Sequence, residues 1–169
     1  NSFKWFKKRA EYDGYAVEKQ DTLYYMAVIA HKFLGKPWNE CFDLYLDCYN
    51  FDPKRAETLF FIAEHYIQES KTATAELFLR KAFALGTPEI TMSVRKHIYQ
   101  LHIPLELSKI CLKTKDWKTG EECCRAILKY QPEHQLNNQL LSVFYLMNRV
   151  GPSRGEKFSE RPLICFISP

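Results

Sequence analysis

The chain has 169 residues, of which 46% are hydrophobic and 15% aromatic, so it has enough apolar side chains to bury a core and disorder is excluded. Twenty-four basic and 20 acidic residues give a formal net charge of +4 that is spread along the chain, without the basic stripe typical of nucleic-acid binding. Because of this charge distribution we expect no nucleic-acid partner. No run of about 18 apolar residues and no signal peptide occurs, so we also expect no membrane span.

Two further features of the whole sequence set its expected context. The chain begins without methionine, which suggests a piece of a longer protein. Its six cysteines form no CxxC pair and no other spacing typical of metal ligands. We therefore expect reduced, buried thiols, a cytoplasmic location, no metal and no cofactor.

Residues 1–20 are predicted to form an N-terminal basic and aromatic helix or linker. Trp5 and Phe6 lie among four basic residues, an arrangement that can bind single-stranded nucleic acid or a membrane surface. A helix whose aromatic side chains dock on Tyr24 and Tyr25, with its lysines facing water, is the favoured interpretation.

Residues 21–149 are predicted to form the main domain, which contains three helix hairpins. The first comprises helices at 23–33 and 39–50, joined by a turn at 35–37 and ended by Asp52 and Pro53. The second comprises helices at 59–66 and 73–85 and is stopped by the Gly-Thr-Pro sequence at 86–88. The third comprises helices at 105–113 and 117–130, closed by Gln131 and Pro132.

Three segments depart from this hairpin pattern. Residues 89–100 have apolar residues at helical spacing and predict a short helix packed between the second and third hairpins. Residues 134–149 predict a terminal capping helix. Residues 150–161 are rich in Gly, Pro, Ser and charge and predict a linker, and the apolar run in 162–169 predicts either the first strand of a following α/β domain or a tail that docks on a helix.

A period of 34 residues relates the first two hairpins, because Cys41, Tyr45 and Cys48 recur as Ala75, Leu79 and Ala82. The third hairpin keeps the same spacing, starting from Gly120. Small residues let antiparallel helices approach, and bulky residues fill the gap beside them. The predicted repeat anchors are Cys41, Tyr45, Cys48, Pro53, Ala63, Tyr66, Ala75, Leu79, Ala82, Cys124, Ile127 and Pro132.

The second hairpin resembles the tetratricopeptide repeat, with Ala63 and Tyr66 on its first helix and Ala75, Leu79 and Ala82 on its second. This resemblance implies an all-α fold, a right-handed superhelix of antiparallel helix hairpins. One hairpin alone cannot bury its apolar face, so about three must stack.

A narrower resemblance covers roughly residues 21–148 and rests on the segments LYYMA, IPLELSKICL and DWKTGEECCRAIL, with an Asn-Asn pair in the last helix. These segments look like the tetratricopeptide segments of large multidomain glycosyltransferases of bacterial and giant-virus type. Such segments lie between or after nucleotide-sugar-binding α/β domains. The apolar run near the end of the sequence favours the same family.

The repeat resemblance also implies a concave groove lined by the first helix of each hairpin. The candidate groove residues are Glu57, Phe60, Glu64, Ile67, Leu105, Lys109 and Leu112. The clamp of Lys and Asn that chaperone-binding members of the family use for a terminal carboxylate is not present. We therefore expect either an amphipathic or extended peptide in the groove, or a neighbouring domain of the same chain.

No set of residues in the sequence predicts catalysis. Asp43 and Asp47 lie four apart on a helix, where a solvated face is favoured over a metal site. Zinc could be held by His97 and His102 with Cys111, but the five-residue spacing of the two histidines, across a break at Ile103 and Pro104, is not expected to put both on one helical face. Adjacent Cys123 and Cys124 are expected to pack rather than to form a redox switch.

The expected function is therefore that of a non-catalytic scaffold, spacer or protein-interaction module within a multidomain glycosyltransferase. The alternative is a free-standing adaptor that binds a peptide of a partner protein in the groove.

Overall fold

The computed structural model of the chain describes residues 2–11, 16–89 and 93–150. Within these ranges the protein is entirely helical, with eight α-helices and two short π-helical turns, and contains no strand. In chain order the elements are α1 (Ser2–Ala10), α2 (Ala16–Val28), η1 (Ile29–Phe33), α3 (Trp38–Phe51), α4 (Glu57–Gln68), α5 (Thr72–Leu85), η2 (Ile98–His102), α6 (Ile103–Thr114), α7 (Trp117–Leu128) and α8 (Gln135–Val150). The predicted strand at 162–169, and the predicted linker beyond Val150, lie outside the described residues.

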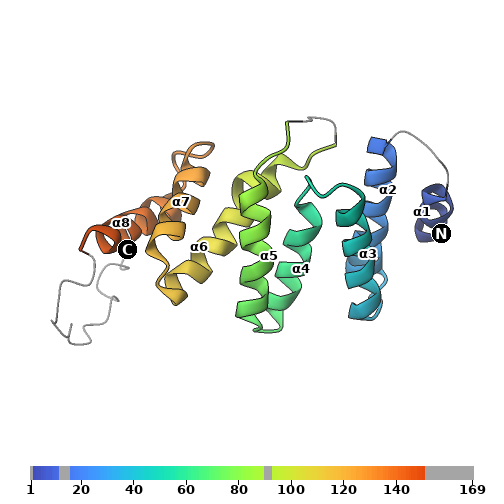
Figure 1. Cartoon of the computed structure of the whole chain (residues 1–169), viewed down its shortest axis with the longest axis horizontal. Coiled ribbons are helices and arrows are strands. Elements are labelled where there is room, and N and C mark those ends of the chain that lie inside the picture. The colour runs from blue at the N-terminus through green and yellow to red at the C-terminus, as the bar shows by residue number, and fades with distance from the viewer. Residues whose placement is uncertain (1, 12–15, 90–92, 151–169) are drawn as a thin grey trace.

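The helices form an elongated, helical-repeat-like stack in which each packs mainly on its neighbours in the chain (Figure 1). Short turns join α2 and η1 to α3, α4 to α5, and α6 to α7, so each of these pairs is an antiparallel hairpin. Helices α1 and α8 lie at the two ends of the described stack. The prediction of an all-helical fold is confirmed.

The hairpin boundaries follow from glycine and proline at the predicted turns. Gly35 and Gly86 adopt φ angles of 55° and 65°, a left-handed conformation in which a side chain would be strained. Helix α5 accordingly ends at Leu85, and α3 starts directly after Pro37. These boundaries agree with the predicted ones.

The N-terminal boundary differs from the prediction. Residues 2–10 form the expected helix, and the ring of Phe6 stacks on that of Tyr25 with centroids 5.7 Å apart. Helix α2, however, begins at Ala16, so the boundary placed between residues 20 and 21 falls inside a helix. Docking of α1 on the first hairpin is thereby confirmed at Phe6, while Trp5 is exposed.

The segment between the second and third hairpins also differs. Instead of a separate helix, residues 96–102 continue directly into α6. In η2 the N–H of Ile103 donates to the carbonyl oxygen of Ile98, five residues back, which widens the helix by one residue. The wider turn accommodates Pro104, which has no N–H to offer. Pro104 therefore does not break the helix, contrary to the prediction.

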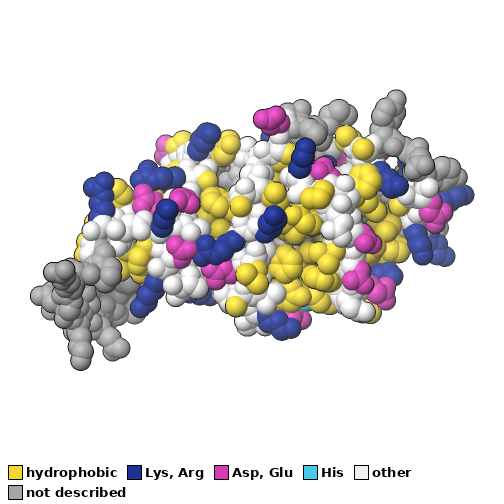
Figure 2. Space-filling model, in the orientation of Figure 1, with side chains coloured by type: hydrophobic (Ala, Val, Ile, Leu, Met, Phe, Trp, Pro, Cys, Tyr) yellow, Lys and Arg dark blue, Asp and Glu magenta, His cyan; other side chains and the backbone are white. Residues whose placement is uncertain are grey.

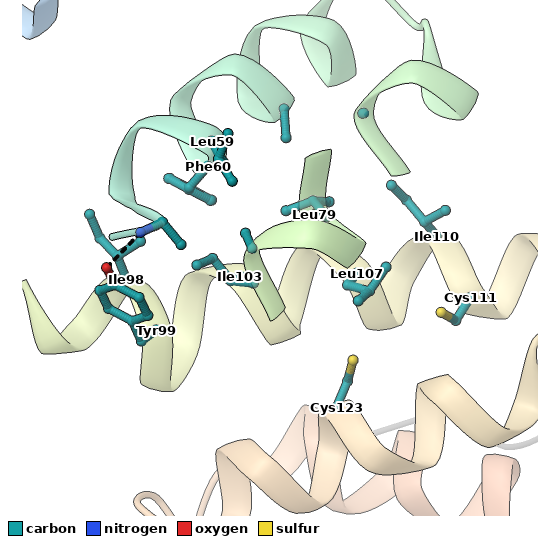
Figure 3. Close-up of a cluster of buried hydrophobic side chains, with 14 of the residues drawn as sticks. Leu59, Phe60, Leu79, Ile98, Tyr99, Ile103, Leu107, Ile110, Cys111 and Cys123 are labelled. Atoms are coloured by element: carbon teal, nitrogen blue, oxygen red, sulfur yellow. Dashed lines mark hydrogen bonds between the residues drawn. The ribbon is translucent and has the colours of Figure 1, made fainter. Parts of the chain in front are cut away.

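The repeat anchors form the core. Nine of them have no exposed surface: Cys41, Tyr45, Cys48, Ala63, Ala75, Leu79, Ala82, Cys124 and Ile127. Tyr66 is half-buried, and Pro53 and Pro132 are exposed just beyond the ends of their helices. Figure 3 shows Leu79 among apolar side chains of α4, η2 and α6. The repeat spacing thus predicted the buried positions correctly.

Helices α7 and α8 approach each other closely at Gly120 of α7. A Cβ atom added there would lie 2.2 Å from the ring of Phe144 on α8, and Phe144 is itself fully buried. Only a residue without a side chain fits between these helices. Gly120 is equivalent in the repeat to Cys41 of the first hairpin and Ala75 of the second. The smallest of these three residues therefore stands at the position against which α8 packs.

Candidate functional site

Two of the seven predicted groove residues are buried. Glu57 is 2% exposed and Phe60 is 6% exposed. Figure 3 shows η2 beside the N-terminal half of α4, where Tyr99 and Ile98 lie below Phe60. The ring of His102 lies 5.6 Å from that of Phe60. The groove prediction is therefore wrong for Glu57 and Phe60, because the unpredicted extension of α6 covers both residues.

The other five predicted groove residues keep some accessible surface: Glu64, Ile67, Leu105, Lys109 and Leu112. Their charged members are paired, since Lys32 Nζ lies 2.6 Å from Glu64 Oε2 and Lys109 Nζ lies 2.6 Å from Glu106 Oε1. Glu64 thus connects α4 to η1, whereas Lys109 pairs within α6. The accessible part of the predicted groove therefore combines partly exposed apolar side chains with charged side chains that are neutralised by ion pairing.

A buried polar cluster replaces the predicted groove at Glu57. Arg55 Nη2 donates to Glu57 Oε1 at 2.7 Å, and the Tyr99 hydroxyl donates to Glu57 Oε2 at 2.6 Å. The same hydroxyl accepts the backbone N–H of Ala56 at 2.8 Å, as the dashed line in Figure 3 marks. Burial raises the pKa of Glu57, but the hydrogen bonds from Arg55 and Tyr99 outweigh it, so the pKa lies below its ordinary value.

The cluster extends to the first hairpin through Arg95. Its Nη1 atom lies 3.2 Å from Asp21 Oδ1, and its guanidinium group stacks 3.5 Å above the ring of Tyr24. Its backbone N–H also donates to Glu57 at 3.4 Å. Asp21 and Tyr24 belong to α2, Glu57 to α4, and Arg95 to the segment that leads into η2, so the cluster joins all three hairpins.

Sequence reasoning missed this cluster. Arg55 and Glu57 stand two residues apart around the start of a helix, and Arg95 lies in a segment without a recognisable motif. The two-residue spacing is common on exposed surfaces as well. The cluster becomes visible only when the stacked hairpins bring these side chains together.

A second cross-hairpin link lies between α5 and the start of α7. Arg80 Nη2 contacts Glu76 Oε1 and Asp116 Oδ2, both at 2.6 Å. Asp116 also caps α7, accepting the N–H of Thr119 at 3.2 Å. One guanidinium group therefore joins the second hairpin to the helix cap of the third.

Aromatic side chains form a seam between the first two hairpins. The rings of Trp38 and His65 stack 3.5 Å apart at an interplanar angle of 11°, and those of Tyr66 and Phe78 stack at 6.0 Å. Figure 2 shows apolar side chains gathered over α3, α4 and α5, with charged side chains around them. The seam is half-buried and mainly holds α3 against α4 and α5.

His31 connects this seam to the interior. Its Nδ1 atom lies 3.0 Å from the Tyr45 hydroxyl. Burial lowers the pKa of His31, and the nearby Lys32 and His65 lower it further. Because the folded state resists protonation of His31, the stabilisation it provides is present above the ordinary pKa of 6.5 and is lost as the pH falls below it.

We expect the urea midpoint of the protein to fall as the pH is lowered through 6.5, and His31→Gln to flatten this dependence. Unfolding followed by tryptophan fluorescence at a series of pH values would measure it. The exposed His97→Gln serves as the matched control for the loss of a histidine. An identical profile in the His31 variant would contradict the assignment.

The five cysteines in the described part of the chain are free and buried: Cys41, Cys48, Cys111, Cys123 and Cys124. Burial raises the pKa of Cys111 to about 11 and of Cys48 and Cys124 to about 12. Figure 3 shows Cys111 and Cys123 on the facing helices α6 and α7. Their environment is that of packing side chains, because the thiolate form needed for reaction is disfavoured.

In a Cys165→Ser background we expect these thiols to react with a disulfide reagent at pH 8 only after unfolding. Absorbance of the released thiolate should show almost no reaction in the native protein and five equivalents in guanidinium chloride. Rapid reaction of Cys123 or Cys124 in the native state would show an accessible thiol and would contradict a packing role.

The structure brings His97 and His102 together, although the sequence predicted that they would not share one helical face. The rings of His97 and His102 lie 5.5 Å apart, because the π-helical turn of η2 places residues five apart on one face. Cys111 lies two helical turns further on, so the proposed third ligand is not available. Across the ranges 2–11, 16–89 and 93–150, no group of three or more His, Cys, Asp or Glu residues could hold a metal ion. Asp43 and Asp47 are exposed, as expected.

Of the helices that the structure describes, none combines the length and apolar character needed to cross a membrane. The chain matches no model of a known protein family and no curated protein.

Proposed function

We propose that the chain is a non-catalytic, tetratricopeptide-like spacer, a right-handed superhelical segment that sets the distance between domains of a multidomain glycosyltransferase. The fold supports this proposal through its repeat spacing and its sequential packing. The resemblance of residues 21–148 to the helical segments of such enzymes supports the context.

The observation that carries the proposal is the set of polar links between successive hairpins. Asp21, Arg95 and Glu57 join the first hairpin to the second and third, and Arg80 joins the second to the third. A spacer has to resist bending between its units, and such links hold the hairpins at fixed angles where apolar packing alone would allow sliding. The buried groups that could take part in a reaction, Glu57 and the thiols, are all used in packing or pairing.

Calorimetry tests the non-catalytic part of the proposal. Titrating uridine and guanosine diphosphate sugars into the chain, with and without Mn²⁺, should give no binding heat. Micromolar binding of any of these donors would contradict the assignment. The reading frame on both sides of the chain tests the context, since a nucleotide-sugar-binding α/β domain is expected to flank it and the lack of such a domain on either side would contradict it.

A peptide-binding adaptor is the second candidate, favoured by the surface at the end of η1. Phe33 is 78% exposed next to Lys32, which pairs with Glu64, so an apolar anchor of a peptide could dock there beside an ion pair. Peptides selected against the chain by phage display should lose binding to Phe33→Asp. Leu77→Asp, on the second helix of its hairpin and 70% exposed, is the matched control and should keep it.

A further inference from the structure

Helix α1 packs on the rest of the stack through one face. The ring of Phe6 stacks on Tyr25, and Phe3 packs against the buried cluster that α2 and α3 share, with Lys36 Nζ 5.0 Å from the centre of its ring. Phe3, Phe6 and Ala10 are three and four residues apart, so they share this face of the helix. Figure 1 shows α1 at one end of the stack, and its opposite face is therefore turned away from the other described helices.

The opposite face of α1 presents Lys4, Trp5 and Lys8, which we call the α1 face. Lys4 and Lys8 are four residues apart and Trp5 and Lys8 three, so the three side chains are neighbours on the helix surface. All three are exposed, and Trp5 is 60% exposed. The other two tryptophans of the chain, Trp38 and Trp117, are partly buried. An exposed indole ring thus lies between two exposed ammonium groups.

The charge of α1 is positive throughout. Four of its nine residues are basic and none is acidic, and the nearest acidic residue in the sequence, Glu11, follows the end of the helix. Arg9 pairs with Glu18 of α2, whereas no ion pair between described residues involves the three lysines of α1. These lysines are free to pair with a partner, and charge complementarity requires that partner to be anionic.

An anionic lipid surface fits the α1 face better than a nucleic acid does. Indole rings are enriched at the boundary between lipid headgroups and acyl chains, and lysines beside them lie at the level of the headgroups. Single-stranded nucleic acids are held along a groove by several stacking rings. Helix α1 has one exposed ring on a short convex surface, because Phe3 and Phe6 are half-buried against the stack.

We propose that the α1 face is a peripheral membrane contact, which binds bilayers that contain anionic lipids. The ring of Trp5 enters the interface, and Lys4 and Lys8 pair with the headgroups on either side of it. The contact is weak and reversible, because a nine-residue helix with one inserted ring provides less than the two signals that stable anchoring takes. This role goes beyond the spacer function and does not depend on it.

Co-sedimentation of the full chain with vesicles tests the proposal. Vesicles of phosphatidylcholine and phosphatidylserine should bind the chain at low salt, and vesicles of phosphatidylcholine alone should not. Lys4→Glu/Lys8→Glu should weaken binding by at least about 25-fold, since each basic residue near an anionic surface contributes about five-fold. Lys81→Glu/Lys118→Glu is the matched control, with the same net charge but with exposed lysines of α5 and α7, and it should bind like the wild type. Circular dichroism checks that both variants fold.

Tryptophan emission gives a second readout that needs no charge reversal. Anionic vesicles should shift the emission of the wild type to the blue, and Trp5→Phe should lose this shift, because Trp38 and Trp117 are partly buried. A lack of binding to anionic vesicles, an equal loss in both lysine pairs, or a shift that persists in Trp5→Phe would overturn the proposal. Tighter binding of a labelled oligothymidine than of vesicles, lost in Lys4→Glu/Lys8→Glu, would also overturn it by assigning the α1 face to a nucleic acid.

Discussion

Gly120→Ala is expected to destabilise the protein by about 1–3 kcal/mol, the cost of inserting a methyl group into a packed core. In an open helix the same change would stabilise by about 1 kcal/mol, because alanine is the better helix former. The sign is reversed here because the new Cβ would lie 2.2 Å from the buried ring of Phe144. Urea denaturation followed by circular dichroism would measure the change in the free energy of unfolding.

A double-mutant cycle identifies the cause. Phe144→Leu removes the ring that the methyl group would meet, so Gly120→Ala should cost less in that background than in the wild type. The free energies of the two substitutions should therefore not be additive. If Gly120→Ala were equally destabilising with Leu at position 144, the close approach of α7 and α8 would not be its explanation.

Glu57→Gln is expected to cost about 3 kcal/mol, because it removes the nearer carboxylate of the buried guanidinium group of Arg55 and leaves only Asp21 Oδ1, 3.9 Å from Arg55 Nη1. The substitution keeps the size and shape of the side chain, so the loss reports the charge rather than the packing. Chemical denaturation at neutral pH would measure it. The exposed Glu69→Gln, which breaks the pair of Glu69 with Lys71, is the control and should leave the midpoint unchanged.

The pH dependence distinguishes loss of charge from loss of packing. The pKa of Glu57 is lower in the folded than in the unfolded state, so the stabilisation is fully present above the ordinary value of 4.5 and disappears as the pH falls through the folded pKa. The difference in stability between the wild type and Glu57→Gln should therefore narrow in acid. A difference that stays constant between pH 7 and acid would contradict the ionic role.

The sequence contained enough information for the helices and their buried positions. The 34-residue period placed Cys41, Ala75 and their companions in the core, because the packing of two helices against each other depends on side-chain size at fixed spacing. Gly35 and Gly86 marked the turns, since a left-handed backbone conformation favours glycine.

The surface was harder to predict than the core. Glu57 and Phe60 occupy groove positions in a regular repeat, and nothing local indicated that residues 96–102 would extend α6 across them. Pro104 suggested a helix break, because the π-helical turn that absorbs it has no reliable sequence signature. Contacts such as Arg95 with Asp21 span 74 residues and depend on the angles at which hairpins stack, which propensity and spacing do not determine.

The single extra residue accommodated in η2 changes the phase of the helix that contains it. Each residue of an α-helix turns by about 100°, so the side chains before η2 are rotated by about that angle relative to an uninterrupted helix. Tyr99 can consequently reach Glu57 on α4 while Leu107 and Cys111 of the same continuous helix remain in the core shared with α7. Deleting one residue from η2 would restore a regular α-helix. Its side chains could then keep either the contact of Tyr99 with Glu57 or the core packing against α7, but not both.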